Sequence, residues 1–190
     1  AKVRFHDGHW ANNYTFRRPV RPRLTCSERI FPPQQPGIVT TTAGAITLFG
    51  HVFYRKDLYA NDFLGGYPQK MSLFHAMLFA HEMTHVWQWQ NRKTTKYHPL
   101  KAAQEHTPGG DPYLFDLKTD ARFSDYAYEQ QGAIVEEFVC CRALDPTAPR
   151  TRRLGAMLEQ AFGTNALHST LPRPEAILPW QGAATKGICM

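Results

Sequence analysis

Ser72-Leu-Phe-His-Ala-Met-Leu-Phe-Ala-His-Glu-Met-Thr-His-Val-Trp-Gln-Trp-Gln90 is a largely apolar segment without glycine or proline. This composition predicts a buried helix that begins near Ser72, whose hydroxyl can cap it, and ends near Asn91. Within it, His81-Glu-Met-Thr-His85 is an HExxH motif. Residues four apart on a helix lie about 40° apart around the axis and about 6 Å along it, so both imidazoles can reach one metal ion.

The HExxH motif is typical of zinc metallopeptidases. Glu82 would lie beside the metal-binding face, where a carboxylate can take a proton from metal-bound water and pass it to a leaving amine. The alternative is a hydrogen-bonded histidine pair in the core, but such groups are costly to bury without a metal. We therefore predict that His81 and His85 bind Zn²⁺ and that Glu82 is the catalytic base.

Length and composition predict one domain. The chain has 190 residues, 43% of them hydrophobic, which is enough for one sizeable core over residues 1–190. No run of about eighteen apolar residues indicates a membrane span, and the first residues lack signal-peptide character. Because the chain begins without Met, we expect a processed product or a part of a larger protein.

The net charge of +6 favours anionic partners such as nucleic acid, acidic lipids or cell-wall polymers. The basic residues are scattered, however, and no cluster is interleaved with aromatic residues as in a nucleic-acid module. They therefore indicate a solvated basic surface, and nucleic-acid binding is not expected. The clusters are Arg17 to Arg23, Arg92 to Lys96, and Arg150 to Arg153.

The region before the motif helix divides into two parts. Residues 1–36 are rich in proline and arginine with little periodicity, so we expect an irregular wrap over the domain. Two β-rich runs follow, Ile38 to Thr42 and Ala45 to Tyr54, and Ala43-Gly44 between them predicts a hairpin. The second strand of that hairpin can offer its edge to an extended peptide.

The region after the motif helix is predicted to hold a long loop and two further helices. Residues 92–121 have little periodic pattern and are expected to be mostly loop. A second helix is predicted over residues 124–143, with Ser124 as its cap. Residues 145–190 are expected to contain a short helix, 154–162, and a proline-rich tail. The predicted fold is an α+β, zincin-like domain with an upstream hairpin or sheet and two central helices that carry the zinc ligands.

The four cysteines lack the CxxC spacing of a structural zinc site. Cys140 and Cys141 are neighbours on the second predicted helix and point about 100° apart, so they are poorly placed to bind one metal ion together. The sequence favours buried free thiols. A disulfide from Cys26 or Cys189 to the vicinal pair is the alternative, and the sequence leaves it open.

A catalytic zinc ion usually has three protein ligands and an open position for water, so a third ligand is needed. Residues 86–91 exclude a histidine at the spacing of HExxHxxGxxH. Glu129 and Glu136 share one face of the second helix, whereas Glu137 points elsewhere. We favour Glu129, because the small residues that follow it would let the two helices approach closely. Glu136 stays open as the alternative, and Glu136 and Glu137 are otherwise expected on an exposed acidic face.

Two segments, His81 to Gln88 and Phe123-Ser-Asp-Tyr-Ala-Tyr-Glu-Gln-Gln-Gly-Ala-Ile-Val135, resemble the Vgr-related zinc metallopeptidases of bacteria. These proteins are associated with type VI secretion and similar contractile injection systems. The resemblance spans residues 38–140 and implies a gluzincin-type site. It assigns the zinc ligands to His81, His85 and Glu129, the base to Glu82, and supporting hydrogen bonds to Gln130 and Gln131.

The resemblance also indicates an oxyanion donor and a biological setting. Tyr126 is our preferred donor, because it lies one turn before Glu129 and matches the Asp-Tyr of the family; Tyr128, His98 and His106 are alternatives. The chain departs from the family at Gly132, where alanine is expected, and in its basic terminal segments. We expect a secreted antibacterial effector or toxin that cleaves a polypeptide or a peptidoglycan stem peptide and that has an immunity or secretion-apparatus partner. The alternative is a non-catalytic, zinc-stabilised adaptor or cargo module.

Overall fold

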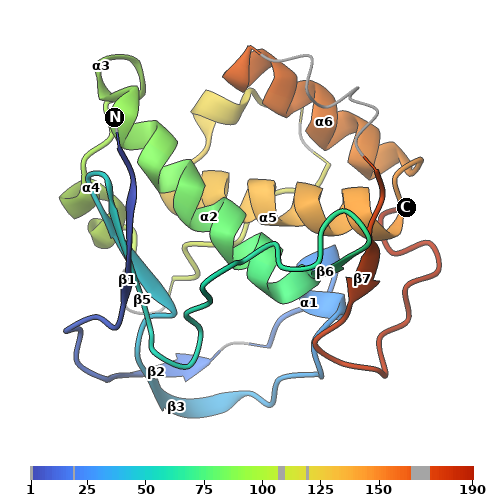
Figure 1. The fold of residues 1–190 in the computed structure, drawn as a ribbon, viewed down its shortest axis with the longest axis horizontal. Helices are drawn as coiled ribbons and strands as arrows, with labels where there is room; N and C mark the ends of the chain where they lie inside the picture. Colours follow the sequence, from blue (N-terminus) through green and yellow to red (C-terminus); the bar gives the residue numbers. More distant parts are fainter. Residues whose placement is uncertain (1, 19, 107–109, 119, 164–171) are drawn as a thin grey trace.

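The computed structural model describes residues 2–18, 20–106, 110–118, 120–163 and 172–190, which form a mixed α+β fold (Figure 1). Its centre is a pair of long helices, α2 (Leu73–Gln90) and α5 (Tyr128–Leu144), which pack against each other. Helix α6 (Pro149–Phe162) packs on α5. The strands and the short helix α1 (Cys26–Arg29) lie on the other side of the helix pair (Figure 1).

Helix α2 has the limits predicted from the sequence. The hydroxyl of Ser72 caps its start by accepting a hydrogen bond from the backbone N–H of His75. Asn91 ends it, and its backbone N–H donates to the carbonyl of Trp87. Leu73, Ala76, Met77 and Val86 are buried, which confirms that this helix belongs to the core.

Helix α5 begins later than predicted. Ser124 does not cap it, because residues Phe123–Asp125 form a separate 3-10 turn. The helix starts at Tyr128 after Ala127, whose side chain has no hydrogen-bond acceptor. The first backbone N–H groups of α5 donate instead to the carboxylate of Glu105, a residue distant in sequence. A long-range cap therefore replaces the local one that the sequence suggested.

The predicted hairpin between residues 38–42 and 45–54 is wrong. The second run turns back on itself at Phe49-Gly50 to give antiparallel strands β4 (Ala45–Leu48) and β5 (His51–Tyr54), and Phe49 has a positive φ of 60°. Strand β4 lies at the edge of a three-stranded sheet with the order β1-β5-β4. Strand β3 (Gly37–Thr41) pairs elsewhere, with β2 (Tyr14–Arg18).

The first 36 residues are more ordered than an irregular wrap. Strand β1 (Arg4–Asp7) pairs in parallel with β5, and β2 pairs antiparallel with β3. Helix α1 begins with a capping box in which Thr25 and Glu28 satisfy each other's backbone N–H groups. The expected loop over 92–121 also contains two short helices, α3 (Arg92–Thr95) and α4 (Pro99–Gln104).

The carboxy-terminal region packs against the rest of the chain. Helix α6 extends five residues further toward the amino terminus than the predicted 154–162. The tail contributes β7 (Glu175–Ile177), which pairs in parallel with β6 (Lys70–Ser72) immediately before α2. Among the described residues, no helix has both the length and the apolar character to cross a membrane.

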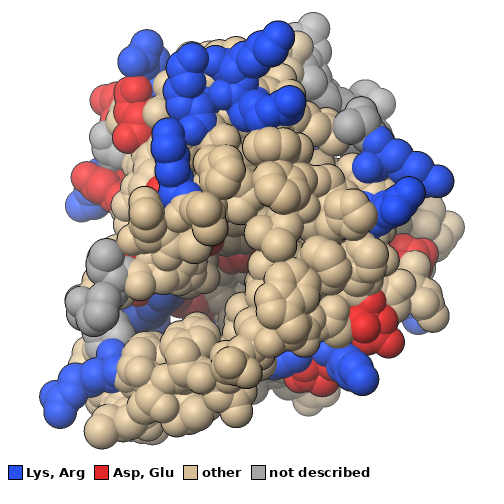
Figure 2. Space-filling model, turned by 90° about the vertical axis from the view of Figure 1, so that its left-hand side faces the viewer, with Lys and Arg blue, Asp and Glu red and all other residues tan. Residues whose placement is uncertain are grey.

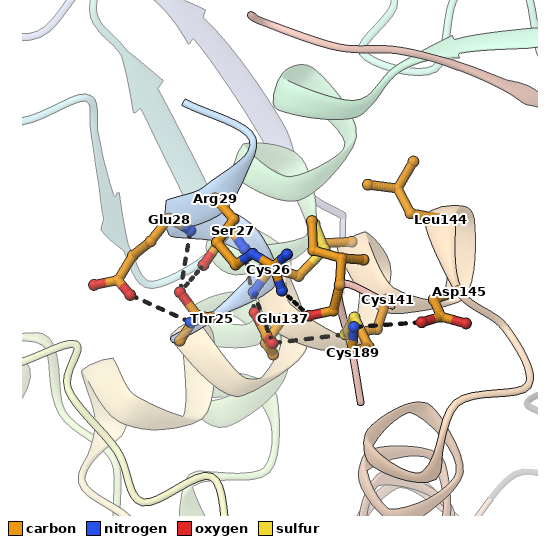
Figure 3. Close-up of a disulfide and its surroundings, with 12 residues drawn as sticks. Thr25, Cys26, Ser27, Glu28, Arg29, Glu137, Cys141, Leu144, Asp145 and Cys189 are labelled. Atoms are coloured by element: carbon orange, nitrogen blue, oxygen red, sulfur yellow. Dashed lines mark hydrogen bonds between the residues drawn. A yellow bond between two sulfur atoms is a disulfide. The ribbon is translucent and has the colours of Figure 1, made fainter. Parts of the chain in front are cut away.

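Two disulfides replace the free thiols that the sequence favoured. Cys26 bonds to Cys140, and Cys141 bonds to Cys189, so the vicinal pair on α5 fixes both α1 and the end of the chain (Figure 3). Neighbouring helix positions point in different directions, and this is why each cysteine meets a different partner.

Glu137 is fully buried next to Cys26 and Cys141, not on an exposed acidic face (Figure 3). Its carboxylate accepts hydrogen bonds from the backbone N–H groups of Cys26 and Ser27 and from the guanidinium of Arg150. The buried charge is therefore paired and holds the start of α1 against α5.

Candidate metal centre

Three side chains from α2 and α5 converge in the core. His81 and His85 project from one face of α2, with their Nε2 atoms 3.2 Å apart. Oε2 of Glu129, near the start of α5, lies 3.3 Å from Nε2 of His81 and 3.5 Å from Nε2 of His85. All three residues are buried, and their ligand atoms lie within 4.8 Å of one another. Two imidazole nitrogens and one carboxylate oxygen thus face a common point.

The orientation of His85 is set by a chain of buried amides. Gln88 donates through Nε2 to the backbone carbonyl of Tyr128 and to Oε1 of Gln131. Its own Oε1 is therefore an acceptor and receives a hydrogen bond from Nδ1 of His85 at 2.8 Å. With its proton on Nδ1, the imidazole of His85 keeps the lone pair of Nε2 free for a metal ion.

His81 is held from the side opposite the convergence point. Its Nδ1 lies 3.1 Å from Oε1 of Glu136, although the two atoms are not aligned as a hydrogen bond. Glu136 is thus next to the non-converging nitrogen of His81 and is not the third member of the group. Gly132 lies directly against the ring, since a Cβ at this position would be only 2.5 Å from Cε1 of His81.

Glu82 lies beside the three converging residues and is also buried. The hydroxyl of Thr47, on edge strand β4, donates to Oε2 of Glu82 at 2.7 Å. This bond joins the helix to the sheet and fixes one oxygen of the carboxylate.

The electrostatics of the group reflect charges packed at short range. Burial opposes protonation of the histidines, but contact with Glu129 raises the pKa of both His81 and His85, and Glu136 adds to the effect at His81. Burial would raise the pKa of Glu129, yet its contacts with His106, His81 and His85 hold that pKa far below its usual range. A negative carboxylate beside two basic imidazoles is a donor set suited to a divalent cation.

Two side chains near the group were not selected as primary candidates from the sequence. Tyr113 has its ring centroid 5.9 Å from that of His81, and burial together with Glu129 and Glu82 raises its pKa well above the ordinary value. Nε2 of His106 lies 3.4 Å from Oε1 of Glu129. The loop that carries Tyr113 has no periodic pattern, so sequence alone offered no signal for it.

Tyr126, the oxyanion donor preferred from the sequence, and two of its alternatives, Tyr128 and His98, make contacts outside the converging group. Tyr126 packs in a hydrophobic cluster with Phe115, and its carbonyl accepts a hydrogen bond from Gln131. The hydroxyl of Tyr128 donates to the carbonyl of Thr95, and His98 caps α4. Of the four residues considered, His106 lies against Glu129.

Gln130 and Gln131, to which the resemblance assigned supporting hydrogen bonds, do not contact His81, His85 or Glu129 directly. Gln131 reaches His85 through Gln88. Gln130 donates to the carbonyl of Leu114 and so fixes the loop next to Tyr113. Neither amide is in hydrogen-bond contact with the converging atoms of the group.

A cavity of about 230 Å³ opens beside His81, between α1, α5 and the loop around Tyr113. Tyr113 and Glu136, which both flank His81, form part of its wall. On the side where β5 and α4 lie, the surface is hollowed near its centre, and acidic residues are visible inside the hollow (Figure 2). His81, His85 and Glu129 are not among the residues that line this cavity, which adjoins His81 through Tyr113 and Glu136.

Comparison with known proteins finds similarity to the type VI secretion system spike protein VgrG2b of Pseudomonas aeruginosa. Over 89 residues the two are 37% identical, which covers 47% of this chain and 8% of the spike protein. No protein-family model matches the chain, and no solved structure matches it. The similarity supports an association with type VI secretion, although this chain spans only a small part of the relative's length.

Proposed function

We propose that this protein is a zinc-dependent metallopeptidase. The observation that carries the proposal is the convergence of three buried residues, His81, His85 and Glu129, beside Glu82. The converging nitrogen and oxygen atoms lie 3.2 to 3.5 Å apart. Two imidazoles and one carboxylate are a ligand set of catalytic zinc sites. Among the described residues, no fourth His, Cys, Asp or Glu joins this group. A three-ligand site leaves a position for water, which favours an enzyme over a closed structural site.

The roles of the residues follow from their positions. Bound Zn²⁺ would polarise the scissile carbonyl and lower the pKa of a water molecule. Glu82, oriented by Thr47, is the residue that would accept a proton from a water molecule at the site and deliver it to the leaving amine. Tyr113 stays protonated at neutral pH and lies beside His81, so it is better placed than Tyr126 to donate to the oxyanion.

The substrate is proposed to bind along strand β4. This strand is at the sheet edge, and an extended peptide can add to such an edge through backbone hydrogen bonds. Thr47 links the same strand to Glu82, so a peptide aligned on β4 would pass next to the catalytic base. Both an unfolded polypeptide and a peptidoglycan stem peptide fit this arrangement.

The biological role is proposed from the spike protein of type VI secretion to which the chain is similar. A peptidase associated with such a spike would act as an effector delivered to another cell. An immunity protein that blocks the site would protect the producing cell. A non-catalytic adaptor would bind zinc equally well but would not need Glu82, which the fold buries and orients at some cost.

The test combines metal analysis with cleavage assays on wild type, Glu82→Gln and Glu129→Ala. We expect about one zinc ion per chain in the wild type. Glu82→Gln should keep the metal and lose cleavage of an unstructured protein or of peptidoglycan, and Glu129→Ala should lose metal. Absence of zinc from the wild type would overturn the proposal, and cleavage retained in Glu82→Gln would remove Glu82 as the base.

A further inference from the structure

The two carboxylate oxygens of Glu129 have different surroundings. Oε2 faces the imidazoles of His81 and His85 at 3.3 and 3.5 Å. Oε1 lies 3.4 Å from Nε2 of His106. A carboxylate can bind a metal ion through one oxygen or through both. The contact with His106 therefore affects whether Glu129 would bind a metal ion through one oxygen or through both.

The backbone of Glu129 is also held by a residue from the same short segment. Glu105 accepts the backbone N–H of Tyr128 through Oε1 and that of Glu129 through Oε2, both at 2.9 Å. Since the preceding Ala127 cannot cap α5, the carboxylate of Glu105 satisfies the first turn of the helix. Negative charge at a helix start is also favoured by the helix dipole.

Glu105 and His106 occupy a defined place at the end of α4. Their backbone N–H groups donate to the carbonyls of Ala102 and Ala103, which continues the turn of the helix. Pro99 and Ala102 are buried, so α4 is anchored to the core. Consecutive residues at one helix end thus contact the backbone and the side chain of Glu129.

We propose that Glu105 and His106 are positioning residues that make Glu129 a one-oxygen metal ligand through Oε2. The inference rests on the proposed function and deepens it. Glu105 fixes the position of the Glu129 backbone, and His106 keeps Oε1 of Glu129 in contact with its own imidazole. A ligand that used both oxygens would occupy the position that a catalytic water needs, so this pair of contacts keeps the site open.

The first experiment compares zinc-loaded wild type with His106→Ala and His106→Gln by X-ray absorption at the zinc edge. His106 is exposed on the surface, so its replacement should leave the fold intact. We expect one additional oxygen neighbour around zinc in His106→Ala, with metal retained, kcat lowered about tenfold and KM little changed. Glutamine at position 106 places a side-chain N–H group near Oε1, so His106→Gln should restore much of the wild-type spectrum.

The second experiment measures zinc affinity in Glu105→Ala and Glu105→Gln. We expect a loss of about 10- to 100-fold in Glu105→Ala, the range typical of residues that orient metal ligands. Glu105→Gln keeps one acceptor oxygen and should lose less. Glu28→Ala is the matched control, because Glu28 accepts the backbone N–H of Thr25 at the start of α1, in the capping box of a helix that carries none of the three converging residues.

The outcomes separate this inference from the proposed function. A wild type without zinc would overturn both. Zinc bound normally in the wild type, with an unchanged coordination spectrum in His106→Ala, would overturn the one-oxygen assignment alone. If Glu105→Ala and Glu28→Ala lowered thermal stability while neither changed zinc affinity, Glu105 would be a helix cap and not a positioning residue.

Discussion

The imidazole of His81, on α2, packs directly against Gly132, on the opposite helix α5. A Cβ on Gly132 would lie 2.5 to 2.8 Å from three atoms of the ring. Such distances are too short for carbon contacts, so the glycine is required for the present position of His81. The close approach also explains how Glu129, one turn earlier, reaches both histidines.

Replacing Gly132 with alanine should displace His81 and weaken zinc binding at least tenfold. Alanine also favours a helix by about 1 kcal/mol over glycine, so the melting temperature of the variant is measured together with its zinc affinity. Competition titration with a zinc chelator measures the affinity. Gly155→Ala on α6 is the control, because its Cβ would meet Phe138 at an ordinary 3.5 Å. That variant should gain stability and bind zinc normally.

The sequence predicted the elements whose signals are local. Helix α2 has a capping serine and no internal breaker, and its limits agree with the prediction. The hairpin was wrong because Ala45 to Tyr54 has strand propensity throughout, while the turn depends on a positive φ at Phe49, which non-glycine residues seldom adopt. The first strand of the predicted hairpin is β3, and it pairs with β2, which lies in the proline-rich region of little periodicity.

Long-range features of the site were harder to derive. The three converging residues follow from helical spacing and helix packing, and these were predicted. Glu105 caps α5 from 23 residues before Tyr128, and such a contact has no spacing rule. Cysteine pairing is equally non-local: Cys26 and Cys140 are 114 residues apart. Tyr113, next to His81, lies in a loop that Gln130 contacts through the carbonyl of Leu114, and this contact has no spacing rule either.

Thr47→Val should slow hydrolysis by about tenfold while zinc affinity stays the same, because the variant removes one hydrogen bond to the charged Glu82 without changing side-chain shape. Steady-state cleavage of a peptide substrate provides the measurement. Thr84→Val is a suitable control, since Thr84 is also buried but its hydroxyl donates to the carbonyl of Ala80 within the same helix. Equal rates for both variants would count against a role for Thr47 in orienting the base.

Reduction of the disulfides should destabilise the protein strongly. The bonds close loops with sequence separations of 114 and 48, and the chain-entropy account assigns about 5 kcal/mol to the first and about 4 kcal/mol to the second. Urea unfolding with and without a thiol reductant tests this expectation. The paired variant Cys141→Ala with Cys189→Ala frees the end of the chain, while Cys26→Ala with Cys140→Ala frees α1. A midpoint unaffected by reductant would show that the two bonds contribute little.

Zinc binding should release protons, and more of them as the pH falls. The raised pKa values of His81 and His85 mean that the metal-free site holds protons at pH values where an unfolded histidine, with a pKa of about 6.5, has lost them. Their contribution to the stability of the metal-free protein is therefore complete below about pH 6.5 and is lost as the pH rises through the raised values. A metal ion needs neutral imidazoles and displaces these protons.

Calorimetric zinc titrations in buffers of different ionisation enthalpy count the protons released. We expect a larger number near pH 6.5 than near pH 8.5, with apparent affinity rising over the same interval. His9→Gln serves as the control, because His9 bonds to the carbonyl of Ala43 and lies outside the converging group. It should reproduce the wild-type proton count at each pH. A count near zero at every pH would mean that the two imidazoles are already neutral before the metal binds, and that Glu129 does not hold their protons in place.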